Sequence, residues 1–124
     1  MHIHGSIDFA ITERSPERVV AEMPITAGIR NPLGIVNAGA ILWFADIAAS
    51  VLVFGPVDPT EDMKGFPLAI NLNAHFLGNQ PEGSFKAVSS FVKRGRTVSV
   101  VRTVVYGAAD KVIADITTSH VLSK

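Results

Sequence analysis

The chain has 124 residues and a mass of 13.2 kDa, which is enough for one domain around a single core, expected over residues 1–124, and too little for two ordinary domains. Eleven basic residues balance eleven acidic ones, so no net charge draws the chain to nucleic acid or to an anionic membrane, and the absence of cysteine excludes disulfides, thiolate metal sites and cysteine nucleophiles. Hydrophobic residues make up 48% of the chain and charged residues only 18%, which favours an oligomer in which a second copy covers part of the surface.

The N-terminal part of the chain predicts a β-hairpin followed by a loop. Residues 1–8 lack the basic start and the apolar core of a secretory signal, so we expect an intracellular, cytoplasmic protein. Apolar and polar residues alternate at residues 7–12 and again at 18–25, on either side of a Ser-Pro turn, which predicts two paired strands. Residues 26–36 contain glycine and proline and are predicted to form a loop.

A helix is predicted over residues 38–54. Asn37 can cap it, because its side-chain oxygen can accept an early helix N–H, and Gly55 and Pro56 end it. The segment is apolar nearly all round, and its only charge is Asp46. A membrane span is a poor alternative. The segment has 17 residues, which rise by about 25 Å, whereas ~20 residues are usually needed to cross a bilayer, and it would carry a carboxylate at mid-depth.

The rest of the chain predicts four further strands. Residues 56–67 contain three prolines and are predicted to form a connecting loop or flap. Residues 68–76 show the cleanest alternation of the chain and are followed by a turn at 78–83. The remaining strands are expected at residues 84–93, 97–106 and 112–122. A helix that is apolar nearly all round can be covered only by a strongly curved antiparallel sheet, so the expected class is α+β, with about six strands wrapped around one long central helix.

Asp46 is the first candidate for a reactive group. An ionised carboxylate taken out of water costs several kcal/mol unless it is paired, hydrogen-bonded or wetted by a cleft. The structural alternative is a carboxylate that caps backbone groups or pairs with a distant arginine such as Arg30. As a reactive group, Asp46 would be the general base that activates water or the nucleophile that forms a mixed anhydride, and the sequence leaves both roles open.

The start of the predicted helix offers a partner for this carboxylate. The amide N–H groups of Ala38 and Gly39 lie at the positive end of the helix dipole, where they would stabilise an oxyanion that develops on an acyl carbonyl. Ala38 and Asp46 are separated by a rise of about 12 Å, whereas a reacting carbonyl must lie about 3 Å from both groups. One protomer cannot supply both, so we expect a homodimer with two composite sites related by twofold symmetry.

The residues that lead into the helix form a motif, Asn31-x-x-Gly34-x-x-Asn37-Ala38-Gly39-x6-Asp46. It resembles the signature of hotdog-fold acyl-CoA thioesterases of the phenylacetate-degradation type, whose usual form is Asn-x-x-Gly-x-x-His-Gly-Gly-x6-Asp. The order of strands, the loop after the helix and the glycine-containing turn at 94–96 also fit, so the resemblance covers nearly the whole chain. It implies a hotdog fold, helices side by side in a dimer, active sites at the interface, coenzyme A as part of the substrate, and no metal or redox cofactor.

The motif departs from its usual form at two positions. Asn37 stands where the family has histidine, and its amide can donate a hydrogen bond to a carbonyl oxygen but cannot move a proton. Ala38 replaces the first glycine and keeps its backbone N–H. On the strand after the helix, family members often place a serine or threonine near Ala69, and Asn71 and Asn73 are the candidates to replace it as substrate-binding residues.

Other candidate residues lie around this constellation. Asn31 would hold the carboxylate, the water or the thioester at the mouth of the site, or would satisfy backbone groups of its own loop. Trp43 is a candidate for the acyl pocket or for the core. Lys93, Arg94 and Arg96 are candidates to bind a phosphate of coenzyme A, although a solvated hairpin end is the commoner explanation.

These observations predict hydrolysis of an acyl-CoA thioester to the free acid and coenzyme A, by a homodimer or a dimer of dimers, with a small aromatic or medium-chain acyl group. The main alternative is a non-catalytic acyl-CoA binding or regulatory protein, because Asn37 and Ala69 remove groups that active relatives use. A hydratase or dehydratase of acyl thioesters is a weaker alternative, because it would need a catalytic histidine at position 37. His75 and His120 are interpreted as separate strand residues, which gives no support to a metal site.

Overall fold

Six antiparallel strands and one long helix form the described part of the chain, residues 1–56 and 66–122 of this computed structural model. The order and the type of these elements agree with the prediction. The strands are β1 (Ala10–Arg14), β2 (Arg18–Pro24), β3 (Pro67–Phe76), β4 (Ser84–Lys93), β5 (Val98–Tyr106) and β6 (Val112–Leu122); the helix is α1 (Ala38–Phe54), and two 3₁₀ turns are η1 (Ala27–Ile29) and η2 (Ala108–Asp110).

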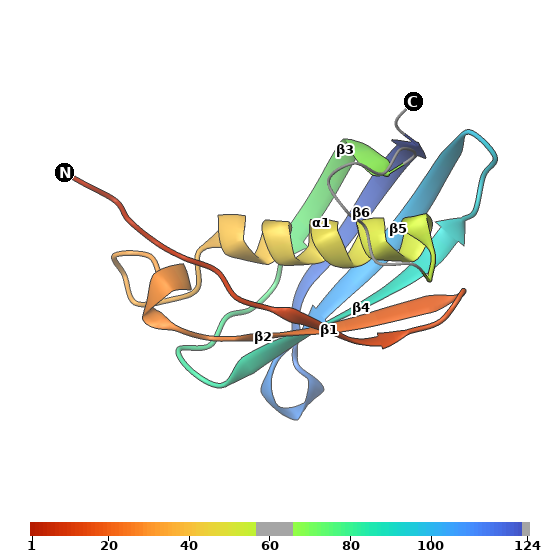
Figure 1. The fold of residues 1–124 in the computed structure, drawn as a ribbon. Coiled ribbons are helices and arrows are strands. Elements are labelled where there is room, and N and C mark those ends of the chain that lie inside the picture. Colours follow the sequence, from red (N-terminus) through yellow and green to blue (C-terminus); the bar gives the residue numbers. More distant parts are fainter. Residues whose placement is uncertain (57–65, 123–124) are drawn as a thin grey trace.

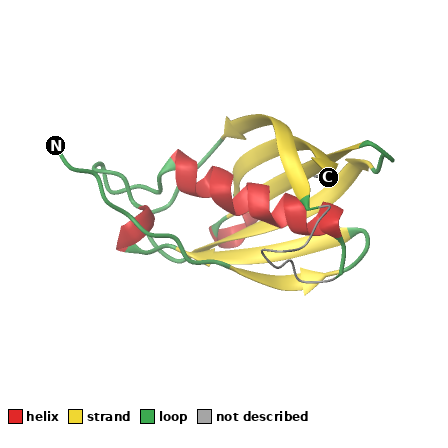
Figure 2. Ribbon diagram, turned by 45° about the horizontal axis from the view of Figure 1, so that its top comes forward, coloured by secondary structure: helices red, strands yellow, loops and turns green. Residues whose placement is uncertain are grey.

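The six strands belong to one sheet, in the order β1-β2-β4-β5-β6-β3, and every neighbouring pair is antiparallel. The sheet curves around α1, which lies on its concave side and contacts β2, β3, β4, β5 and β6 (Figures 1 and 2). This arrangement is the predicted α+β hotdog architecture. Strands β1 and β3 form the two edges of the sheet.

The helix begins and ends where its sequence predicts. Oδ1 of Asn37 accepts a hydrogen bond from the N–H of Gly39 (2.8 Å), which is the N-cap interaction. Gly55 follows the last residue with a φ of 105°, a conformation that favours glycine. Arg14 donates a hydrogen bond to the carbonyl oxygen of Gly55 (2.6 Å), so β1 holds the end of α1. Over the described residues, no helix has both the length and the apolar character needed to cross a bilayer.

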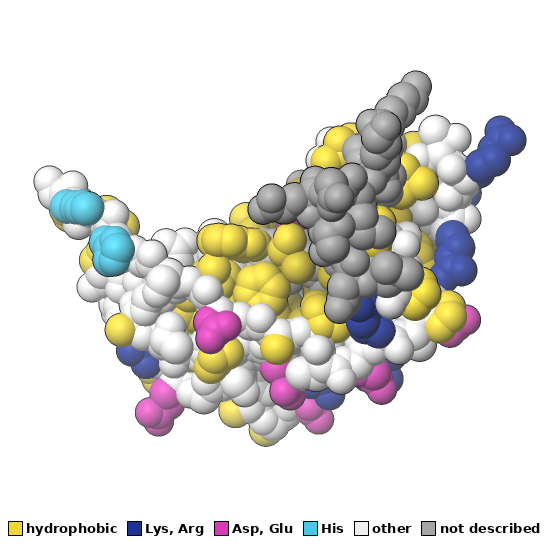
Figure 3. Space-filling model, in the orientation of Figure 1, with side chains coloured by type: hydrophobic (Ala, Val, Ile, Leu, Met, Phe, Trp, Pro, Cys, Tyr) yellow, Lys and Arg dark blue, Asp and Glu magenta, His cyan; other side chains and the backbone are white. Residues whose placement is uncertain are grey.

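The core lies between α1 and the concave face of the sheet. Ile41 and Phe44 of the helix and Met23 and Phe85 of the sheet are among its largest buried side chains. The opposite face of α1 is open: Trp43, which lies on it, is 56% exposed. Hydrophobic side chains gather in the hollow on this side of the molecule (Figure 3). The sheet of one chain therefore wraps one side of the helix, as expected, and leaves the other side open.

The N-terminal segment differs from its prediction. The first strand begins at Ala10 rather than at residue 7, because the preceding residues make other contacts. The N–H of Ser6 donates to the carbonyl oxygen of Gly28 (3.0 Å), and the ring of Phe9 packs edge-on against Phe44, with centroids 5.4 Å apart. Most of the predicted loop at 56–67 lies outside the described residues.

Candidate active site

Asp46 lies on the flank of α1, between the packed face and the open face, and is half-buried. Its Oδ1 is buried and has no hydrogen-bond partner in the described part of the chain. Burial raises the pKa of this carboxyl above its usual range, and the nearby His120 offsets part of that rise. A carboxyl whose pKa is shifted by burial and by a nearby titratable group is typical of a reactive site.

The alternative structural role for Asp46 is not seen. Arg30, the arginine considered as its partner, donates from Nη2 and Nε to the carbonyl oxygen of Pro81 (2.8 and 3.1 Å). The guanidinium therefore holds the loop before β4, and the interpretation of Asp46 as its ion-pair partner is wrong.

The start of α1 offers one amide at once and a second only after a rearrangement. The N–H of Gly39 already donates to Oδ1 of Asn37 in the cap. The N–H of Ala38, by contrast, takes part in none of the hydrogen bonds found among the described residues, and Ala38 is exposed. A ligand carbonyl can therefore reach Ala38 directly, whereas it must displace the side chain of Asn37 to reach Gly39.

Asn31 and Trp43 lie beside this helix start. They line one cavity of about 310 Å³ together with Asn37 and Gly39. Oδ1 of Asn31 accepts hydrogen bonds from the N–H groups of its own loop, at residues 33 and 35 (2.9 and 3.3 Å), so its carbonyl oxygen has the structural role. Trp43 is exposed, so it belongs to the cavity wall and not to the core.

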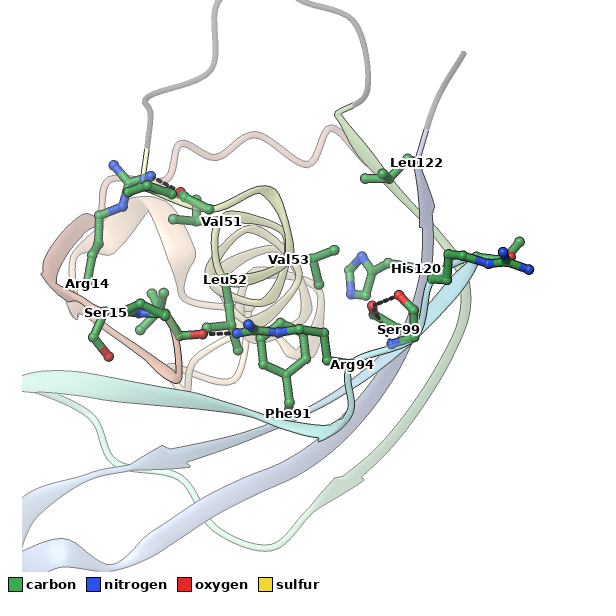
Figure 4. A pocket seen from close by; sticks show the side chains of 17 residues that line it. Arg14, Ser15, Val51, Leu52, Val53, Phe91, Arg94, Ser99, His120 and Leu122 are labelled. Carbon is green, nitrogen blue, oxygen red and sulfur yellow. Dashed lines mark hydrogen bonds between the residues drawn. The ribbon is translucent and has the colours of Figure 1, made fainter.

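A second cavity, of about 490 Å³, lies at the other end of α1. Its walls come from the last turns of the helix, the β1–β2 turn and the β4–β5 turn (Figure 4). Arg94 and Arg96 line it, and Lys93 does not. Arg94 is held in place by a hydrogen bond to the carbonyl oxygen of Pro16 and lies over the ring of Phe91, 4.4 Å from the centroid.

The predicted substrate-binding residues of β3 lie on the outer face of the sheet. Directly paired residues of antiparallel strands share a face, and Ala69 pairs with the inward-facing His120. A bulge between Ala69 and Asn71 then shifts the register, so that Asn71 pairs with Ser119 and Asn73 with Thr117, which both face outward. Within one chain the structure therefore does not bring Asn71 or Asn73 to Asp46.

Sequence reasoning missed His120. Its side chain is only 1% exposed, and its Nε2 lies 2.7 Å from Oγ1 of Thr118. His120, Thr118 and Ile116 occupy every second position of β6 and share its inward face, and this period of two was the available signal. The separation of 74 positions between Asp46 and His120 gave no hint that the imidazole would lie near enough to influence the pKa of the carboxyl.

Comparisons with known proteins agree with this fold. Residues 33–114 match the family described as the thioesterase superfamily. The Bacillus subtilis protein ComA2, a proposed esterase, is 30% identical over 108 residues, which make up 87% of this chain and 83% of that protein. A proposed esterase of Deinococcus radiodurans is 34% identical over 84 residues, so the match spans 68% of this chain and 50% of that relative.

Solved structures with the same fold include a mutant thioesterase of Staphylococcus aureus, at a TM-score of 0.85 and 21% identity, over 94% of this chain and 93% of that one. A hypothetical thioesterase of Streptococcus pneumoniae, solved with coenzyme A, gives a TM-score of 0.81 and 13% identity, over 94% and 86% of the two chains. These likenesses show the hotdog fold. From the match to the family and the relationship to ComA2, the chain belongs to the thioesterase superfamily.

Proposed function

We propose that the protein hydrolyses an acyl-CoA thioester at a site built from Asp46 of one protomer and the start of α1 of another. The observation that carries this proposal is the buried oxygen of Asp46 on the flank of the helix, which has no hydrogen-bond partner among the described residues, in a chain of the thioesterase superfamily. The coenzyme A in the Streptococcus pneumoniae structure supports the choice of substrate class.

Asp46 supports two routes, and both need its ionised form. As a general base it takes a proton from water while the water oxygen attacks the thioester carbonyl. As a nucleophile it forms a mixed anhydride that water then hydrolyses. In both routes the C–S bond breaks, coenzyme A leaves as a thiolate that acquires a proton, and the amides of Ala38 and Gly39 stabilise the oxyanion.

The heptad spacing along α1 supports a composite site. Gly39 and Asp46 are seven positions apart and therefore lie on the same flank of the helix, about 20° from perfect alignment. In an antiparallel pair of helices related by a twofold axis, Gly39 faces Asp46 of the second copy when the axis passes beside residues 42 and 43. Trp43, at that position, is exposed in the single chain and available to such a contact.

The edge strand β3 gives a second reason to expect a dimer. It has ten residues, pairs on one side with β6, and exposes Leu68, Ile70, Leu72 and Phe76. A long apolar edge of this kind invites pairing with another chain unless it is covered. A second copy on this edge would extend the sheet and set the two helices side by side, as the resemblance implies.

The finer substrate assignment stays a prediction. The motif favours the phenylacetate-degradation type, and the cavity of about 310 Å³ beside Trp43 suits a small aromatic or medium-chain acyl group. The cations Lys93, Arg94 and Arg96 remain candidates for a phosphate of coenzyme A, and the fixed guanidinium of Arg94 favours that role over a freely solvated hairpin end.

The Asp46→Asn variant tests the proposal. Release of free thiol from a panel of aromatic and medium-chain acyl-CoAs is measured for the wild type and for the variant. We expect turnover to fall at least about 10²-fold, because the amide cannot accept the proton or attack the thioester. Asp115→Asn is the matched control, because Asp115 forms an exposed ion pair with Arg102 on the outer face and is expected to leave turnover unchanged.

Binding distinguishes the enzyme from its main alternative. If the wild type releases no thiol from any acyl-CoA, yet the wild type and Asp46→Asn bind the same acyl-CoA equally well by calorimetry, the protein is a binding or regulatory module. Equal turnover of the wild type and Asp46→Asn would show that another group performs the reaction.

A further inference from the structure

His120 is a buried titratable residue that the proposed reaction does not yet use. Residues 116, 118 and 120 of β6 are buried, whereas residues 117 and 119 are half-buried on the other face. His120 therefore points from the sheet toward α1. It also lines the cavity at the end of the helix, where Figure 4 shows its imidazole and the side chain of Val53 facing each other.

The flank of the helix that His120 faces is the flank that carries Asp46. Val53 and Asp46 are seven positions apart, so their side chains leave α1 in directions that differ by only about 20°, with a rise of about 10 Å between them. The electrostatic influence of His120 on the pKa of Asp46 indicates that the imidazole lies near the carboxyl across this interval. Ala69, which pairs with His120 across β3 and β6, adds a methyl group here and no competing polar atom. His120 is the inward-facing residue of β6 with a titratable side chain.

The hydrogen-bonding needs of the two residues are complementary. Oδ1 of Asp46 and Nδ1 of His120 are both buried and both without a hydrogen-bond partner among the described residues. An ionised carboxylate oxygen can only accept, and it needs a donor. If the hydroxyl of Thr118 donates to Nε2 of His120, the ring proton lies on Nδ1, the atom that is free to donate.

The charges around the pair lead to the same conclusion. Burial lowers the pKa of His120 and raises that of Asp46, and each residue offsets part of the shift of the other. Among the described residues, no other charged group contributes to either shift. The remaining titratable groups of the strands packed against α1 are exposed or half-exposed: Arg18, Glu22, His75, Lys86, Lys93, Arg102, Tyr106 and Asp115.

The two atoms are not hydrogen-bonded to each other in this structure. We propose that His120 is a positioning residue for Asp46: when the two side chains turn toward each other, its Nδ1–H, fixed by the hydrogen bond between Nε2 and Thr118, supplies the donor that the buried carboxylate oxygen lacks and keeps the carboxylate ionised and oriented. This inference rests on the proposed hydrolysis by Asp46. His120 approaches the carboxylate from the sheet side, so the open side of Asp46 stays available to water and substrate. It performs a task different from that of the histidine that Asn37 replaces, because it acts through Asp46 and not on the substrate.

The dependence of kcat/KM on pH tests this role. Asp46 is active when ionised, so the rate rises as the pH passes through its pKa. In His120→Leu the carboxylate loses its donor, and we expect the acid limb of the profile to move up by about one pH unit, with KM nearly unchanged. In His120→Asn the side-chain N–H takes the place of Nδ1–H, and we expect the limb to return toward the wild-type position.

Two threonine variants provide a matched comparison. Thr118→Val removes the hydroxyl that fixes the ring, and we expect a smaller shift of the acid limb in the same direction. Thr103→Val is the control, because Thr103 is also a buried threonine of the sheet, but its hydroxyl is bonded to Ser89 (2.6 Å). We expect its acid limb to match that of the wild type. Equal limbs in the wild type, His120→Leu and Thr118→Val would overturn the inference.

Nuclear magnetic resonance separates this inference from the proposed function. The pKa of the Asp46 carboxyl, measured by its ¹³C shift, should be higher in His120→Leu than in the wild type whether or not the protein turns over substrate. If that pKa rises but no variant hydrolyses any acyl-CoA, the pairing stands and the proposed function fails. If the wild type is active and the pKa does not move, the inference fails.

The wild type alone provides a decisive measurement should His120→Leu not fold. The ring ¹⁵N shifts of His120 report which nitrogen carries the proton. A proton on Nδ1 supports the inference, and a proton on Nε2 with Nδ1 bare overturns it, because Nδ1 would then have nothing to donate to Asp46.

Discussion

Asp46 combines two environments at the residue scale. Its Oδ1 is buried, while the residue as a whole is half-buried on the flank of the helix, beside the open face. Burial favours the neutral carboxyl, whereas hydrolysis needs the ionised form. A neighbouring group must therefore stabilise the ionised carboxylate in place of the water that burial removes. His120 is the group placed to do so, and Asn37 and Asn31 use their side-chain oxygens for backbone amides of the loop and the helix start.

The raised pKa of Asp46 predicts a pH-dependent stability difference. The folded state holds the proton of this carboxyl more tightly than the unfolded state. The protonated carboxyl therefore stabilises the fold fully below the pKa of the unfolded state, about 3.8, and this stabilisation is lost as the pH rises through the pKa of the folded state. Asp46→Asn stays neutral at every pH. Urea unfolding should therefore show the variant more stable than the wild type at pH 7, with the difference shrinking near pH 3.5. A less stable variant at pH 7 would contradict this expectation.

The cap at Asn37 predicts a loss of stability on its removal. Asn37→Ala leaves the N–H of Gly39 without its partner and should lower the free energy of unfolding by about 1 kcal/mol in urea titrations. Asn37→Ser is the control, because a serine hydroxyl can accept the same hydrogen bond and should keep most of the stability. An equal loss in both variants would show that the cap interaction is not what stabilises the helix start.

At the scale of elements, β3 is the least covered part of the fold. Its outer edge faces no other strand among the described residues, and several of its large apolar side chains are exposed. In addition, the bulge after Ala69 turns the asparagines to the outer face. Because β3 is an edge strand that also contacts α1, a partner paired with this edge would lie beside the helix.

Ile70→Lys tests the role of this edge. A charge on the 58% exposed Ile70 should prevent a second sheet from pairing there, so light scattering should give a monomer mass where the wild type gives a dimer. Turnover should fall with the dimer. Val92→Lys is the control, because Val92 on β4 is equally exposed (62%) and lies away from β3 in the sheet order. A dimeric Ile70→Lys variant would remove the edge from the proposed interface.

At the scale of the whole molecule, the separation along α1 decides the assembly. About 12 Å between Ala38 and Asp46 cannot be closed within one rigid helix, because the hydrogen bonds of the helix fix the rise per residue. The required groups meet only when two helices lie side by side in opposite directions. Catalysis and assembly are thus predicted to fail together.

Complementation measures this coupling. Ala38→Pro removes the exposed amide N–H at a helix position where proline fits, and Asp46→Asn removes the carboxylate, so each variant alone should be nearly inactive. Mixed and refolded together in equal amounts, half of the dimers carry one chain of each kind, and each of these has one intact site of two. We expect about a quarter of the wild-type activity. If activity does not return, the two groups do not come from different chains.

Much of the fold follows from local patterns in the sequence. Helix α1 was predicted with its observed ends, because the cap at Asn37 and the glycine at position 55 act within one turn of the chain. The strands were predicted from alternation, except that β1 starts later, where Phe9 packs on the helix. The candidate site was predicted only in part: Asp46 and the helix start come from one segment, whereas His120 and the outward turn of Asn71 depend on distant pairing.

The sequence by itself determined the element order, the α+β class and the unusual carboxylate at Asp46, because these depend on spacing and on side-chain chemistry within short stretches of chain. Only the tertiary structure decided which face of α1 stays open, that Arg30 binds the loop at Pro81, and that His120 of β6 faces Val53 of the helix (Figure 4). The physical reason is strand register: one bulge or one shift in pairing reverses the face of every side chain that follows, and no local pattern specifies it.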